Sequence, residues 1–119
     1  MLNVIINIII SGVMACVFHE TGHYLVCKML TGIPLEFKFQ WGYLFDKIPV
    51  PRFVWYMPKT EYRKQRAIAA AGFITEAIIC IPLLFAHNMI SWIYPAIVTI
   101  HYFAYPYYAG DASDLNWLK

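Results

Sequence analysis

Residues 2–30 read LNVIINIIISGVMACVFHETGHYLVCKML, a long apolar segment that contains the pentapeptide HETGH in its second half. Apart from Asn and Ser, residues 2–18 are apolar, and the apolar run resumes after His23. As one α-helix the segment would be about 43 Å long, which exceeds the ~30 Å hydrocarbon layer of a bilayer. We expect a membrane span rather than a signal peptide, because no basic region precedes the apolar run.

The composition of the whole chain supports a membrane protein. Of its 119 residues, 61% are hydrophobic and 13% are charged, whereas soluble domains have about 45–50% apolar and about 25% charged residues. A chain this short cannot bury such an apolar excess, and disorder requires the opposite bias. The net charge of +2 and the absence of a basic stripe in the sequence give no reason to expect nucleic-acid binding.

Two further apolar runs follow the first one. Residues 67–86 contain a single charged residue, Glu76, and residues 89–110 contain none. Tyrosine and tryptophan lie near both ends of the last run, as in the aromatic belts of membrane helices. We therefore expect three transmembrane helices, at about 2–30, 67–86 and 89–110.

Residues 31–66 differ from the rest, because they contain short β-prone pieces separated by glycine and proline. We expect a small β-hairpin or three-stranded sheet at the membrane surface. The fold class is thus an all-α membrane protein with this β-element between helices 1 and 2, in a single domain over residues 1–119. Seven of the nine Lys and Arg residues lie in 31–66, so the positive-inside rule predicts that this loop and the C-terminus are cytoplasmic and the N-terminus is outside.

The pentapeptide His19-Glu20-Thr21-Gly22-His23 is an HExxH motif. On a helix, positions i and i+4 share a face, so His19 and His23 can bind one zinc ion with Glu20 beside them as general base. Ionisable groups within a membrane span are costly unless they are compensated, and a divalent metal compensates them well. A polar patch that hydrogen-bonds between helices is the competing interpretation of these three residues.

A catalytic zinc usually has three protein ligands and one open position, so a third ligand is required. With the predicted topology, Asp111 and Asp114 reach the same side of the membrane as the two histidines, and Glu76 lies close enough to remain a candidate. His101 fits better as a hydrogen-bonded residue between helices. The complete set of candidates is Asp111, Asp114, Glu76, Cys16, His87 and His101.

The sequence resembles the site-2 protease family of intramembrane zinc metalloproteases. Residues 19–37 (HETGHYLVCKMLTGIPLEF) are similar to the HExGH helix and following turn of that family, and residues 66–76 (RAIAAAGFITE) to the start of its next core helix. Residues 106–111 (PYYAGD) match the Pro-to-Asp spacing of its third motif. The resemblance implies a minimal three-helix core without a PDZ domain, one Zn²⁺ per chain held by His19, His23 and Asp111, and Glu20 as catalytic base.

The expected function is therefore an intramembrane zinc endopeptidase that cleaves a transmembrane or membrane-proximal peptide segment of another protein. Glu76 and Asp114 are kept as alternative ligands, and Glu76 also as a group that contacts substrate. Glu76 and Phe103 stand where the family has asparagines, which favours the alternative of a non-proteolytic membrane protein with a structural, sensing or partner-binding zinc site. A membrane subunit without metal is a third interpretation. Three helices enclose little space, so a homo-oligomer or partner subunit is expected to complete the site.

Overall fold

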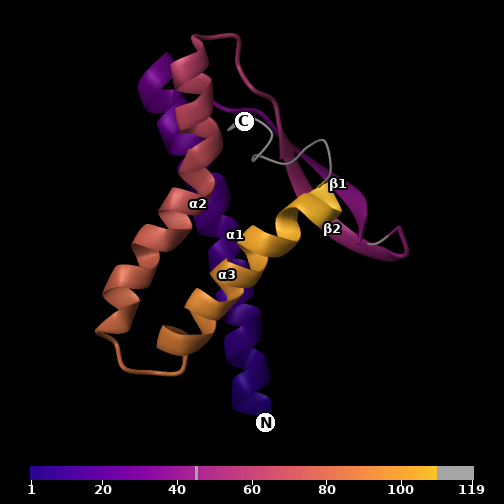
Figure 1. The fold of residues 1–119 in the computed structure, drawn as a ribbon, viewed down its shortest axis with the longest axis vertical. Helices are drawn as coiled ribbons and strands as arrows, with labels where there is room; N and C mark the ends of the chain where they lie inside the picture. Colours follow the sequence, from indigo (N-terminus) through magenta and orange to yellow (C-terminus); the bar gives the residue numbers. More distant parts are fainter. Residues whose placement is uncertain (45, 110–119) are drawn as a thin grey trace.

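The computed structural model describes residues 1–44 and 46–109, and within them it has three helices and one β-hairpin (Figure 1). The mainly helical fold with a β-element between the first two helices is confirmed. In chain order the elements are α1 (Leu2–Thr31), β1 (Phe37–Leu44), β2 (Ile48–Trp55), α2 (Tyr62–Leu84) and α3 (Ile90–Ala109).

The helix bounds agree with the apolar runs except at the start of α2. This helix begins at Tyr62, five residues before the expected 67. Its first turn is polar, with the sequence YRKQR, and Arg, Lys and Gln are good helix formers. A criterion based on apolar residues alone therefore misses this turn. Helices α1 and α2 are long and apolar enough to cross a membrane, whereas the stretch of α3 with described side chains is shorter.

The β-element is a two-stranded antiparallel hairpin. Of the two expected alternatives, a hairpin or a three-stranded sheet, the described residues form the hairpin, and Asp46 between the strands has a φ of 58°. Phe37, Phe39, Trp41 and Tyr43 alternate along β1, so they share one face of the hairpin, and all four are exposed. The hairpin thus presents an aromatic surface beside the helices.

Helices α1 and α2 approach each other closely at two glycines. A Cβ at Gly22 would collide with Thr75 Oγ1 and would lie 2.5 Å from the backbone oxygen of Ala71 on α2. A Cβ at Gly72 would lie 2.5 Å from Nε2 of His23 and 2.7 Å from Nε2 of His19 on α1. Small residues allow helix backbones to approach closely in membrane proteins, and here they bring α2 against the HExxH segment.

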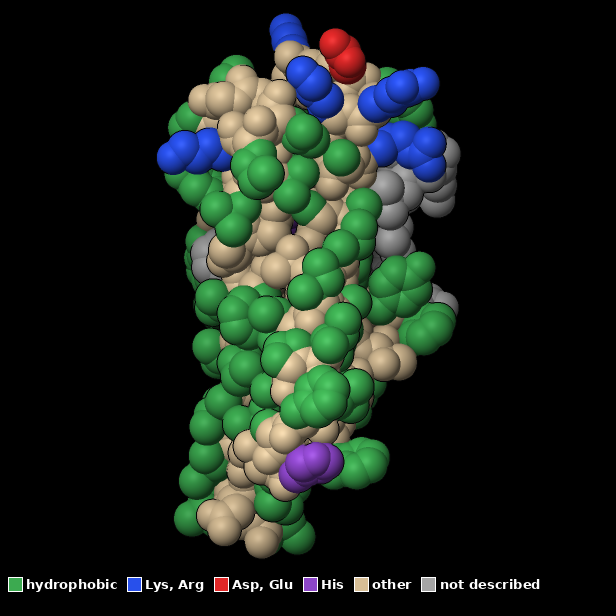
Figure 2. All heavy atoms as spheres, turned by 90° about the vertical axis from the view of Figure 1, so that its left-hand side faces the viewer, with side chains coloured by type: hydrophobic (Ala, Val, Ile, Leu, Met, Phe, Trp, Pro, Cys, Tyr) green, Lys and Arg blue, Asp and Glu red, His purple; other side chains and the backbone are tan. Residues whose placement is uncertain are grey.

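Several polar and ionisable side chains are buried between the helices, while many large apolar side chains are exposed. The buried positions of α1 are small or polar and include Ser11, Ala15, His19 and His23. The isoleucines and valines of its N-terminal half face outward. Figure 2 shows apolar side chains over the length of the visible face, while Lys and Arg gather at one end. An apolar exterior with ionisable side chains turned toward the interior of the bundle is typical of proteins surrounded by lipid.

A short turn connects α2 to α3 and is fixed by hydrogen bonds at the start of α3. The backbone N–H of Ser91 donates to Oδ1 of Asn88 over 3.2 Å, and the Ser91 hydroxyl donates to the Leu83 carbonyl over 2.5 Å. Further along α3, the buried Tyr94 hydroxyl donates to the backbone oxygen of Glu76 over 3.2 Å. These bonds fix the position of α3 along α2.

We predict that Gly22→Ala destabilises the fold by about 1–3 kcal/mol, because the added methyl group overlaps backbone atoms that cannot move independently. The matched control is Gly12→Ala on the same helix, where a Cβ meets no atom within 4 Å; we expect it to be neutral or stabilising by at most about 1 kcal/mol. Thermal unfolding in detergent measures both. Equal stability of the two variants would contradict a close crossing at Gly22.

Candidate metal centre

The two histidines of HETGH lie side by side on the buried face of α1. His19 is 1% exposed and His23 is fully buried. Their rings are nearly perpendicular, with an interplanar angle of 81°, and their Nε2 atoms are 3.0 Å apart. The i and i+4 spacing thus brings two ring nitrogens to one point, as the motif predicts.

The other nitrogen of each ring is bonded to an acceptor on α2. Nδ1 of His23 donates to the backbone oxygen of Ile68 over 2.7 Å. Nδ1 of His19 donates to Oε1 of Glu76 over 2.5 Å. A neutral imidazole has one N–H, so a proton on Nδ1 leaves Nε2 as an acceptor with a lone pair. Two acceptors that face each other at 3.0 Å repel unless a cation or a proton lies between them.

Gly72 allows α2 to lie close to both Nε2 atoms. A methyl group at this position would lie within 2.7 Å of each of them. In metal sites, histidines almost always donate their second ring N–H to a carboxylate, a carbonyl or water. The convergent nitrogens, the two acceptors behind them and the absent side chain together fit a metal-binding pair.

Glu76 connects the three helices. Its side chain is fully buried, and its carboxylate accepts hydrogen bonds from His19 on α1 and from Nδ1 of His101 on α3. The distances from His101 Nδ1 are 2.9 Å to Oε1 and 3.2 Å to Oε2. His19, Glu76 and His101 form a group that could itself hold a metal ion. The expectation that His101 hydrogen-bonds between helices is confirmed.

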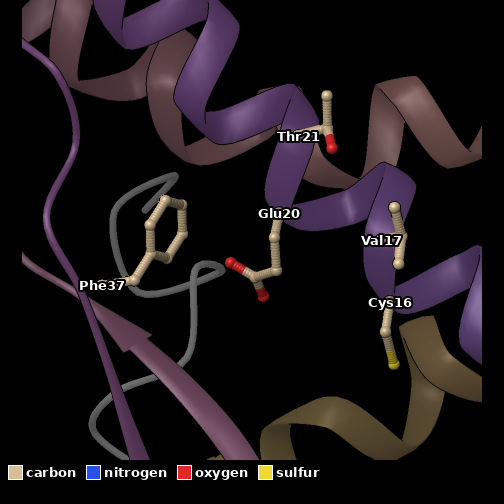
Figure 3. A pocket seen from close by; sticks show the side chains of 5 residues that line it. All are labelled: Cys16, Val17, Glu20, Thr21 and Phe37. Carbon is tan, nitrogen blue, oxygen red and sulfur yellow. The ribbon is translucent and has the colours of Figure 1, made fainter.

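Glu20 lies on a neighbouring face of α1, where it lines an open pocket of about 350 Å³ with Cys16, Val17, Thr21 and Phe37. In Figure 3 its carboxylate extends from α1 toward the ring of Phe37 at the start of β1. Glu20 is only partly buried, in contrast to the histidines next to it. The pocket therefore adjoins the side chain of Glu20, although its Oε2 atom is itself buried.

The first residue pair of the hairpin covers the histidines and this pocket. Phe37 pairs with Trp55 across the two strands. Phe37 lines the Glu20 pocket, and the ring of Trp55 lies 4.7 Å from that of His23. On α2, Phe73 packs edge-on against His19 with ring centroids 4.6 Å apart. Aromatic rings thus hold both imidazoles in place.

The other sequence-derived candidates lie at different places. Asp111 and Asp114 are outside the described residues. Cys16 is exposed and lines the Glu20 pocket instead of the buried face that carries His19. His87 is exposed in the turn between α2 and α3. Among the described candidates for a third ligand, the structure brings Glu76 and His101 to His19.

Sequence reasoning missed the contact between Glu76 and His101, although a signal for it exists. Glu76 lies ten residues before residue 86, where the second apolar run ends. His101 lies eleven residues after Ile90, where α3 begins. The two residues are thus almost equally far from the turn between the helices. Helices joined by a short turn place such positions at the same depth. No comparable sequence pattern indicates that Gly72 and Trp55 lie against the histidines. These contacts depend on how α2 and the hairpin are rotated relative to α1.

Comparison with protein families, with curated proteins and with solved structures gives no match to this chain. The function is therefore argued from the site.

With Zn²⁺ as a probe of the two Nε2 atoms, we predict at least about tenfold weaker binding to Gly72→Ala than to the unmodified chain, because the methyl group displaces both Nε2 atoms from their positions. The control Ala77→Ser changes an exposed small residue of the same helix and should leave affinity unchanged. Competition with a fluorescent zinc chelator measures both affinities. Unchanged zinc affinity in Gly72→Ala would show that no ion binds in front of these nitrogens.

Proposed function

We propose that this chain is a membrane-embedded zinc endopeptidase that cleaves a transmembrane or membrane-proximal segment of another protein. The observation that carries the proposal is the pair of Nε2 atoms 3.0 Å apart, with both Nδ1 atoms committed to acceptors. Glu20 follows His19 directly and faces an open pocket. A purely structural histidine pair would require neither two Nε2 atoms that face each other nor a carboxylate beside them at a pocket.

The separation of the ring nitrogens favours zinc bound through the two Nε2 atoms. Two ligands of a tetrahedral zinc ion at about 2.0–2.1 Å lie about 3.3 Å from each other, which is close to the 3.0 Å between the histidines. In contrast, the 2.5 Å between His19 Nδ1 and Glu76 Oε1 is too short a separation for two ligands of one such ion. We propose Asp111 as the third ligand, with Asp114 and Glu76 as alternatives.

His19 and His23 would hold the zinc ion, which when bound would supply Lewis-acid chemistry for the activation of water and the polarisation of a peptide carbonyl. The carboxylate of Glu20 accepts the proton of the attacking water and returns it to the leaving amine. His19 and His23 keep their Nδ1 protons throughout, because Glu76 and the Ile68 carbonyl accept from them. The groups behind the histidines therefore need no rearrangement during turnover.

The hairpin offers a means of presenting substrate. In the described part of the chain β1 pairs only with β2, so its second edge can accept an extended peptide by strand addition. Phe37 begins β1 and also lines the Glu20 pocket, which places that edge beside the proposed base. A helical substrate would have to unwind locally to pair in this way.

The placement of charge supports insertion in a bilayer with residues 31–66 and the C-terminus in the cytoplasm. The Lys and Arg side chains gather at one end of the face seen in Figure 2, and cytoplasmic loops are enriched in these residues. In this orientation the aromatic face of the hairpin lies at the membrane surface, where Trp and Tyr are favoured. We propose three membrane spans, with α3 as the third.

A second candidate function is a non-proteolytic metal site, and the group of His19, Glu76 and His101 favours it. If Glu76 and His101 were ligands together with the HExxH histidines, the ion would have four protein ligands and no open position. Closed sites of this kind are structural. The chain would then use its metal for stability, sensing or partner binding.

We predict that Glu20→Gln lowers the cleavage of a model membrane substrate by about 10²–10⁴-fold and leaves Zn²⁺ affinity unchanged, because Gln keeps the shape of the side chain but cannot accept the proton. Glu61→Gln is the matched control on an exposed carboxylate at the start of α2 and should cleave normally. The assay uses purified protein in detergent. Undiminished cleavage by Glu20→Gln would exclude the proposed mechanism.

A further inference from the structure

We propose that Glu76 and His101 are positioning residues for the metal centre, in which His101 on α3 orients the Glu76 carboxylate and Glu76 in turn orients the ring of His19. This inference rests on the metal site of the proposed function. It assigns neither residue as a ligand. It makes α3, which carries neither HExxH histidine, a part of the machinery that shapes the site.

The Glu76 carboxylate is held by hydrogen bonds from two helices. Its two donors within the described part of the chain are ring nitrogens, with His19 Nδ1 at 2.5 Å and His101 Nδ1 at 2.9 Å from Oε1. The carboxylate is fully buried, so bulk water cannot replace either donor. A buried charge without such partners would be strongly unfavourable. Each contact therefore restricts the orientation of the carboxylate.

The surroundings restrict the same three side chains further. Phe73 packs against the rings of both His19 and His101, with centroid distances of 4.6 and 5.4 Å. The Tyr94 hydroxyl donates to the backbone oxygen of Glu76 and fixes α3 against this turn of α2. The rings of His19 and His101 are themselves 5.0 Å apart. Little freedom remains for Glu76 to swing toward the Nε2 side of His19.

The direction of the bonds determines the role. Glu76 accepts a hydrogen bond from Nδ1 of His19. The other ring nitrogen, Nε2, faces His23. The contact with Glu76 fixes the ring tautomer and makes Nε2 a stronger base, which is the usual action of a carboxylate behind a metal-binding histidine. His101 reaches His19 only through Glu76, so its hydrogen bond affects the site only while residue 76 has a side-chain acceptor.

The test is a Co²⁺ titration of the full chain in detergent, with affinity and the visible absorption spectrum as readouts. We expect Glu76→Gln to bind Co²⁺ about tenfold more weakly with an unchanged spectrum, because the amide keeps the acceptor but loses the charge. We expect His101→Phe to weaken binding by a similar factor. His101→Gln should restore affinity to within about threefold of wild type, because its amide N–H can donate to the same carboxylate.

Two controls separate positioning from general damage. His87→Phe and His87→Gln make the same changes at an exposed histidine in the turn before α3 and should bind Co²⁺ like wild type. In a Glu76→Ala background, which has no side-chain acceptor, His101→Phe should have no additional effect on affinity, since it acts through the carboxylate. Thermal unfolding of each metal-free variant establishes that the fold is retained.

Two results would overturn the proposal. Unchanged Co²⁺ affinity in both Glu76→Gln and His101→Phe would show that neither residue shapes the site. An altered spectrum in Glu76→Gln, together with equal losses in His101→Phe and His101→Gln, would show that they are ligands. The proposed peptidase activity is decided separately by cleavage with Glu20→Gln, so either idea can fail while the other stands.

Discussion

The close crossing of α1 and α2 is the constraint on which the candidate site depends. Gly22 and Gly72 allow the two backbones to approach until the imidazoles of α1 meet acceptors on α2. At a larger separation, His23 could not reach the backbone oxygen of Ile68 and His19 could not reach Glu76. The HExxH sequence supplies the two rings, and their Nδ1 bonds to α2 leave both Nε2 atoms facing each other beside Gly72.

The polar groups of this crossing lie inside a helical body with an apolar exterior. In such surroundings a hydrogen bond is stronger than in water, and a buried polar group that loses its partner finds no replacement. His19, His23 and Glu76 are therefore held in one arrangement more firmly than the same residues on a soluble surface would be. A site that is already ordered needs little reorganisation when it binds an ion or a substrate.

Much of the architecture follows from the sequence, because apolar length and periodicity are local properties. The three helices, the β-element at residues 31–66 and the shared face of His19 and His23 could all be predicted in this way. The partners of those histidines could not. Whether Glu76 faces His19, a substrate or lipid depends on the rotation of α2 about its own axis, and a nearly uniform apolar helix gives little indication of that rotation. The contact of Trp55 with His23 depends in the same way on how the hairpin folds back over α1. Asp111 stays a prediction from the resemblance, since it lies outside the described residues.

The turn between α2 and α3 has a consequence for how this chain can change. Because Ser91 ties the start of α3 to the end of α2, the number of residues between Ser91 and His101 determines which side chain of α3 meets Glu76. One residue inserted within this part of α3 would move the following residues by about 1.5 Å along the helix and rotate them by about 100°, which would carry His101 off the carboxylate. This part of α3 should therefore accept substitutions at its exposed positions more readily than any change in its length.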